Sequence, residues 1–241
     1  MIAMMLQRVV AGTVWVAALL PSAMTIPVGA ADSAGLAVVI ANGYDETLPA
    51  SLRDAGAIAD KLEENGFATI RLLGATGGDM AAGIVQIRQA AETAGPLRLV
   101  YMTGFGMCVS DDIVLFAEDM QPEQFKSGQI GDVVVPVSLV ADAASTGAER
   151  TLVVFDINPR RCTKDMVNAV KLPENAALLI TTGIGGDIID EVDEKGMSAF
   201  ATAFVDAFAA GRSIKDIVTD VIAQVREMTD GQQTPILVGE L

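Results

Sequence analysis

The sequence predicts an α/β protein, a three-layer sandwich in which a six-stranded, mainly parallel sheet carries helices on both faces. Three observations support this prediction. Short apolar runs rich in β-branched residues recur along the chain, as in strands buried on both faces of a parallel sheet. Segments with one apolar helical face separate these runs. Strands that alternate with helices over about 200 residues are typical of this architecture.

In the first half of the chain, the expected elements follow one another with clear boundaries. They are a strand over residues 36–41, a helix over 52–64, a strand over 67–73, a helix over 80–92 and a strand over 97–103. Ser51 with Asp54, and Thr76 with Asp79, predict a capping box at the start of each helix. Gly95-Pro96 ends the second helix.

The expected elements of the second half are shorter. They are an edge hairpin at residues 113–117, a helix over 138–144, strands over 151–156 and 176–182, helices over 198–210 and 213–228, and a strand over 234–239. A glycine-rich, acidic stretch lies between the fifth core strand and the last two helices. Neither a repeat nor a linker divides residues 32–241, so we expect one domain.

Residues 1–31 have the three-part layout of a secretory signal peptide. Arg8 precedes an apolar stretch, and small residues up to Ala31 offer a cleavage position. The alternative is an uncleaved membrane anchor over residues 9–30, which is long enough to span a bilayer. Pro21 fits a cleavage region better. We therefore expect a periplasmic or secreted protein without a membrane segment after signal removal.

Composition restricts the classes of partner. The formal net charge is −15, and 51% of the residues are apolar. Such an acidic surface repels nucleic acid and anionic lipid headgroups, and it suits partners that are basic, apolar or metal ions. The chain lacks a glycine-rich phosphate-binding motif, and we expect no cofactor, calcium excepted.

Several short strings, in order, resemble the caspase-like superfamily, in particular bacterial metacaspase-type and orthocaspase-type peptidase domains. They are Leu36-Ala-Val-Val-Ile-Ala-Asn-Gly43, Leu48-Pro49 with Asn65-Gly66-Phe67, Tyr101-Met-Thr-Gly-Phe-Gly-Met107, Val154-Phe-Asp-Ile-Asn-Pro-Arg160, Ser198-Ala-Phe200 and Gln233-Thr-Pro235. The similarity covers residues 36–239. It implies the caspase-like fold and an ancestral cysteine endopeptidase activity.

The two positions that matter most for that activity depart from the family. Phe105 matches the position of the family's catalytic His, and Asn158 matches that of its Cys. The reaction needs a thiolate nucleophile and an imidazole that transfers the proton. Neither side chain supplies these groups, and the chain contains no His. The sequence therefore predicts a pseudoenzyme without catalytic residues.

The same resemblance indicates residues that still line the former cleft. Asp156 can bind a Lys or Arg side chain of a partner, or it can satisfy neighbouring loop amides. Gly104 and Gly106 keep the backbone conformation that presented the His. Phe105 either plugs the cleft, which we favour, or offers an apolar contact. Two residues of the turn after the first strand complete the expected binding set, and they are Asn42 and Asp45.

The two cysteines, Cys108 and Cys162, follow the two degenerate positions closely. Two alternatives remain open: a disulfide across the old cleft, which an oxidising compartment allows, or two separate thiols without a catalytic role. A third hypothesis keeps an enzyme, a cysteine-type hydrolase that uses Cys108 as its nucleophile. That hypothesis lacks a base.

Acidic clusters raise the hypothesis of calcium binding, since hard cations take several carboxylate ligands. The clusters are Asp111-Asp112, Glu118-Asp119, and the loop that contains Asp187, Asp190, Glu191, Asp193 and Glu194. The loop spacing does not match an EF-hand. A solvated surface loop is the plain alternative. We expect a caspase-like protein that acts by binding a peptide or protein partner, with a calcium-dependent regulatory or structural protein as the first rival.

Overall fold

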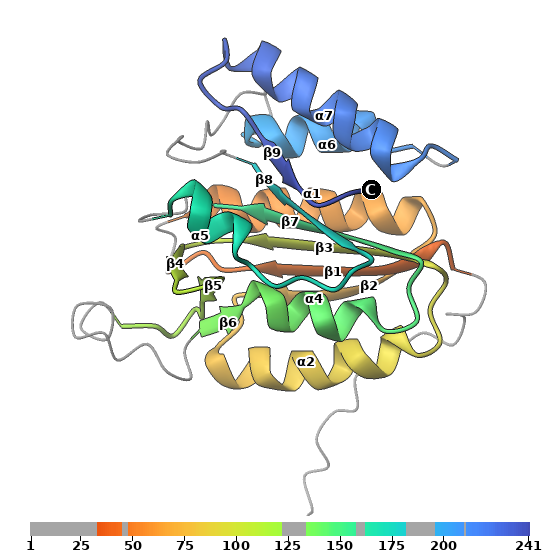
Figure 1. The fold of residues 1–241 in the computed structure, drawn as a ribbon, viewed down its shortest axis with the longest axis vertical. Helices are drawn as coiled ribbons and strands as arrows, with labels where there is room; N and C mark the ends of the chain where they lie inside the picture. Colours follow the sequence, from red (N-terminus) through yellow and green to blue (C-terminus); the bar gives the residue numbers. More distant parts are fainter. Residues whose placement is uncertain (1–32, 45–47, 122–133, 158–161, 182–195, 210) are drawn as a thin grey trace, which may run out of the picture.

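The structure, a computed structural model, describes residues 33–44, 48–121, 134–157, 162–181, 196–209 and 211–241. Its central feature is a six-stranded sheet in the order β2-β1-β3-β7-β8-β9 (Figure 1). The strands are β1 (Gly35–Ala41), β2 (Phe67–Leu73), β3 (Leu97–Thr103), β7 (Arg150–Asp156), β8 (Ala176–Ile180) and β9 (Ile236–Val238). All neighbours pair in parallel except β8 and β9. This confirms the predicted sheet.

Helices cover both faces of the sheet (Figure 1). They are α1 (Pro49–Glu64), α2 (Gly77–Ala91), α4 (Val137–Ser145), α5 (Lys164–Asn168), α6 (Ala199–Ala207) and α7 (Ile214–Met228). One buried cluster includes side chains from α2 and α4, and a second includes side chains from α1, α6 and α7. Successive side chains of β1 alternate between the two clusters. Because both of its faces are covered, that strand is apolar throughout.

The two predicted capping boxes have different outcomes. The box at α2 is confirmed, since Thr76 accepts from the backbone of Asp79 and the Asp79 carboxylate accepts from the backbone of Thr76. The box of Ser51 and Asp54 is wrong, because α1 begins earlier, at Pro49, and its N-cap makes no side-chain hydrogen bond. Proline suits the first turn because no helical partner exists there for an N–H. The Asp54 carboxylate instead accepts from the backbone N–H of Ser198.

The short strand expected near residue 113 is not at the edge of the main sheet. Instead β4 (Gly106–Val109), β5 (Asp112–Phe116) and β6 (Val134–Pro136) form a separate antiparallel sheet. The five-residue helix α5 was also not predicted, since its sequence is too short for a periodic pattern. Within the described ranges, the helices are too short or too polar to cross a membrane.

A buried cation connects the ends of two helices near the start of β3. Arg98, in β3, is only 2% exposed. Its guanidinium donates to backbone carbonyls, namely those of Ala91 (2.9 Å), Ala144 (2.9 Å), Thr146 (3.1 Å), Leu97 (3.1 Å) and Gly95. Ala91 ends α2, and Ala144 and Thr146 lie at the end of α4. Carbonyls at helix C-termini lack helical partners and carry partial negative charge, so Arg98 satisfies both helix ends at once.

Candidate functional site

The register of the sheet brings the predicted site residues to one edge. Ala41 pairs with Thr103, and Thr103 pairs with Asp156, so the chain leaves β1, β3 and β7 at the same level. Open α/β sheets place their ligands beyond this carboxyl edge. The segments that follow these strands include Asn42, Gly104 and Phe105. The structure therefore assembles these positions on one side of the molecule.

Phe105 lies on the ring of Tyr44 at this edge. The two ring centroids are 4.7 Å apart and the rings are tilted by 35°. The backbone N–H of Phe105 donates to the Tyr44 hydroxyl oxygen at 3.1 Å. The Phe105 side chain remains 38% exposed, so it is not the enclosed plug that we favoured. It offers an apolar contact to the surroundings.

Tyr44 fixes the backbone around Phe105. Its hydroxyl donates to the carbonyl of Phe116 at 2.8 Å, while accepting from Phe105. Burial raises the pKa of Tyr44 well above its usual range, which keeps this hydroxyl protonated as a donor. The φ angle of Tyr44 is 51°, in the left-handed region that costs a non-glycine residue about 1–2 kcal/mol. The hydrogen bonds of the ring hydroxyl hold it there.

Replacing Tyr44 with phenylalanine should therefore lower the free energy of unfolding by about 1–3 kcal/mol, since the N–H of Phe105 loses its acceptor and the carbonyl of Phe116 a donor. Urea denaturation followed by circular dichroism measures the change. The control is Leu139→Ala, an exposed apolar position on α4, which should change stability by less than about 0.5 kcal/mol. A Tyr44→Phe variant as stable as the original chain would contradict the assigned role.

The two glycines beside Phe105 are required by geometry. Gly104 has a φ of 142°, in the region that L side chains rarely adopt. A Cβ on Gly106 would lie 2.5 Å from the carbonyl oxygen of Val114 and 2.6 Å from Ile157. Close packing of β4 on β5 and on the end of β7 thus demands glycine there. Both residues shape the backbone and contribute no functional group.

Asn42 is a structural bridge. Its side chain is buried, donates to the carbonyl of Phe116 at 2.7 Å and accepts from the N–H of Ala75 at 2.9 Å. It therefore joins the ends of β1, β2 and β5. The neighbouring Gly43 donates its N–H to the Glu118 carboxylate at 2.8 Å. Asp45, the other predicted binding residue of this turn, lies outside the described residues.

Asp156 is the buried acid of the site. It ends β7 and is 2% exposed. The hydroxyl of Tyr101 donates to it at 2.6 Å, and the hydroxyl of Thr181 donates to its other oxygen. Burial, the charge of Asp156 and the charge of Asp54 raise the pKa of Tyr101 far above its usual range. Two side-chain hydroxyls thus hold the carboxylate below the surface of the edge.

Cys108 and Cys162 are joined in a disulfide, with their Cα atoms 5.1 Å apart. Of the two alternatives that the sequence left open, the structure has the bridged one. A sulfur atom in a disulfide carries no thiolate, and Cys108 is only 3% exposed. While the bridge is closed, Cys108 cannot act as the nucleophile of a hydrolase.

The described acidic residues do not converge on a cation. Asp111 forms an ion pair with Lys171 at 2.9 Å, and the hydrogen bond from Lys171 lowers the pKa of Asp111. Asp112 accepts from Ser138, and Asp119 accepts from the N–H of Gly77. In the part of the chain that the structure describes, no three acidic, cysteine or histidine side chains could share a metal ion. The proposed calcium loop with Asp187, Asp190 and Asp193 lies outside that part, as does Asn158.

Sequence reasoning missed the three hydroxyl-bearing partners in this site, Tyr44, Tyr101 and Thr181. Tyr101 sits in a strand whose other residues are mostly apolar, and Thr181 directly follows one. A polar group in a strand buried on both faces requires a hydrogen-bond partner, which was the available signal. The identity of the partner depends on the order of the strands, and the local sequence does not contain it.

A fold with a mainly parallel six-stranded sheet, two helical layers and a small antiparallel sheet after β3 defines a caspase-like α/β protein. The family model described as "Caspase domain" matches residues 34–241, and this chain belongs to that family. No curated protein sequence matches the chain.

Two solved structures are similar to the chain at the level of the fold. The first, described as the structure of pro-sf-caspase-1, has a TM-score of 0.58 and 14% sequence identity, over 86% of this chain and 87% of that chain. The second is caspase-1 from Spodoptera frugiperda, with a TM-score of 0.55 and 15% identity, over 86% of each chain. These values confirm the predicted fold.

Proposed function

We propose that this protein is an exported caspase-domain pseudoenzyme that binds a peptide or protein partner at the carboxyl edge of its sheet and does not cleave it. One observation carries the proposal: the chain contains no histidine. A Cys–His peptidase needs an imidazole to take the proton from the thiol and to return it to the leaving amine. Phe105 stands at the position that corresponds to the family's His, and a benzene ring transfers no proton.

Retention of an ordered edge supports a binding role. The Phe105 backbone is held by Tyr44, and Gly104 and Gly106 adopt conformations and contacts that other residues cannot. The exposed ring of Phe105 then presents a rigid apolar surface. Aromatic side chains on a fixed backbone are effective contact residues, because binding costs them little conformational entropy.

The charge of the protein defines the kind of partner. With a net charge of −15, the surface attracts basic proteins and peptides and accelerates their association. Asp156 ends β7 at the same edge and, although buried, adds a negative charge there. We therefore propose a basic or apolar peptide segment as the ligand, with Phe105 as the contact residue and Asp156 as an electrostatic contribution.

A peptide titration tests this proposal. Fluorescein-labelled peptides of equal length with basic, apolar or acidic side chains are titrated with the purified chain, and anisotropy reports binding. We expect saturable binding of basic or apolar peptides that weakens about tenfold in Phe105→Ala, a typical loss for a central aromatic contact.

The matched control is Leu139→Ala on α4, because Leu139 has the same 38% exposure as Phe105. This variant should bind as the original chain does. Equal losses in both variants, or binding confined to acidic peptides, would refute the proposed surface. Release of peptide fragments during the titration would refute the pseudoenzyme.

Export is a separate part of the proposal, and it rests on the layout of residues 1–31. Expression of the full chain in a bacterium, followed by N-terminal sequencing of the protein from the periplasm, should give a mature N-terminus close to Ala31. A chain that stays in the membrane fraction with an intact N-terminus would support the anchor instead.

A further inference from the structure

A single disulfide joins two segments that are 54 residues apart, and it does so beside the proposed binding edge. Cys108 lies in β4, which begins directly after Phe105, and Cys162 precedes the short helix α5. β4 pairs with β5 in the small antiparallel sheet. The bond therefore ties the segment after β7 to the small sheet and does not involve the strands of the central sheet.

The described non-covalent contacts of the segment around α5 are modest. The helix has five residues, too few to be stable by itself, and Thr163 caps it with a hydrogen bond to the N–H of Met166 at 3.3 Å. Val167 is its buried side chain, and Cys162, Met166 and Val170 pack against the same core cluster from half-buried positions. Among the described links of this segment, the disulfide is the covalent one.

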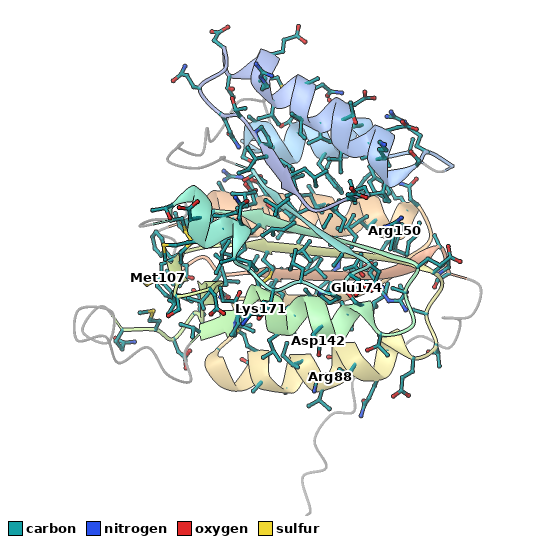
Figure 2. All side chains as sticks on the ribbon, viewed as in Figure 1. Arg88, Met107, Asp142, Arg150, Lys171 and Glu174 are labelled. Carbon is teal, nitrogen blue, oxygen red and sulfur yellow. A yellow bond between two sulfur atoms is a disulfide. The ribbon has the colours of Figure 1, made fainter. Side chains whose placement is uncertain are left out.

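Another contact of this segment is an ion pair on the surface. Lys171, labelled in Figure 2, pairs with Asp111 at 2.9 Å, and their side chains are 83% and 55% exposed. Solvent and salt weaken such a pair, so it does not replace a covalent bond. The central sheet, by contrast, is enclosed by two large apolar clusters. Loss of the disulfide should therefore release one segment and leave the sheet intact.

We infer that the Cys108–Cys162 disulfide is a redox-operated tether, which fixes the segment from Cys162 to Lys171 against the small sheet when oxidised and releases it when reduced. The inference concerns the conformation of this segment and does not depend on the proposed binding function. Regions with few buried contacts open locally at a lower free energy than the core, which is the property that such a switch requires.

The two sulfur atoms differ in accessibility, and this sets the course of reduction. Cys108 is 3% exposed, whereas Cys162 is partly exposed. A thiolate from a dithiol reductant attacks Sγ of Cys162, forms a mixed disulfide there and expels the thiolate of Cys108, which takes up a proton. The second thiol of the reductant then displaces Cys162. The protein gains two electrons and two protons, and the dithiol becomes a cyclic disulfide.

Hydrogen exchange measured by mass spectrometry tests the inference on the full chain. It compares the oxidised protein, the protein treated with dithiothreitol, and a Cys108→Ser/Cys162→Ser double variant. In both forms that lack the disulfide, we expect peptides that cover residues 162–171 to exchange about tenfold faster or more. Peptides from β1, β3 and β7 should keep their protection.

Three outcomes would overturn the inference. They are unchanged exchange in residues 162–171 of the double variant, loss of protection throughout the central sheet, and a disulfide that dithiothreitol does not reduce in the folded chain. Treatment of the double variant with dithiothreitol is the control, and it should change nothing. Reduction with the monothiol glutathione, stopped early with iodoacetamide, should leave the mixed disulfide on Cys162 and the alkyl group on Cys108.

Discussion

Replacing Arg98 with methionine is expected to lower the free energy of unfolding by about 3–5 kcal/mol, out of a total of about 5–15 kcal/mol for a domain of this kind. Methionine fills most of the volume but donates no hydrogen bond. The carbonyls of Ala91, Ala144 and Thr146 would then be left at the ends of α2 and α4 without their donor. A buried polar group without a partner costs about 1–3 kcal/mol.

Two further variants show how much of this loss comes from the hydrogen-bond geometry of Arg98. One keeps the charge, and the other removes an arginine at the surface. Arg98→Lys keeps the charge, but a single ammonium cannot reach both helix ends, so we expect a loss between those of the original chain and Arg98→Met. Arg88→Met is the surface control, because Arg88 on α2 forms an exposed ion pair with Asp142 on α4 at 3.2 Å (Figure 2). It should change stability by less than about 0.5 kcal/mol.

Burial lowers the pKa of Arg98, yet arginine stays charged in proteins, so Arg98→Met removes a buried charge and Arg98→Lys keeps one. Urea denaturation gives the free energies. An Arg98→Met variant within about 0.5 kcal/mol of the original chain would show that the carbonyls find other donors, and the assigned role would be wrong.

Replacing Asp156 with alanine is expected to cost about 2–4 kcal/mol, because the hydroxyls of Tyr101 and Thr181 lose a buried acceptor. Tyr101→Phe should cost about 1–2 kcal/mol, since it removes one donor and leaves the carboxylate with the other. In the double variant, the two losses should not add, and a coupling of about 1 kcal/mol or more is expected for groups in one network.

The matched control for this cycle is Asp142→Ala, which removes an acid whose side chain is 68% exposed. It should leave stability within about 0.5 kcal/mol. Losses of Tyr101→Phe and Asp156→Ala that add to within about 0.3 kcal/mol would mean that the two groups do not stabilise each other. Asp156→Asn keeps an acceptor oxygen at this place, and it is the variant to use in the peptide titration.

The strands of the central sheet were predictable because their pattern is local. The run from Leu36 to Ala41 is apolar throughout, and such a run has few alternatives to a buried strand. Capping was predicted correctly at Thr76, where side chain and backbone are close in sequence. It failed at Ser51, whose side chain instead accepts from the hydroxyl of Thr103, 52 residues away.

The sequence predicted where the site lies in the fold. It did not predict most of the side-chain contacts within the site. The family strings placed Phe105 and Asp156 at one edge, and the register of the strands bears this out. The exposure of Phe105 depends on Tyr44 from another loop, and the link between Cys108 and Cys162 depends on the distance between two segments. Arg98 appeared as one polar residue in an apolar strand, and its partners come from two helices.

The central claim is that a caspase-type fold persists here without the groups that cut peptide bonds. The most direct measurement is hydrolysis of fluorogenic peptides that carry arginine, lysine or aspartate before the reporter, by purified chain in parallel with its Phe105→Ala and Asp156→Asn variants. We predict rates equal to the buffer blank for all three proteins. Hydrolysis above the blank that follows the protein through purification, and that changes in either variant, would contradict the claim.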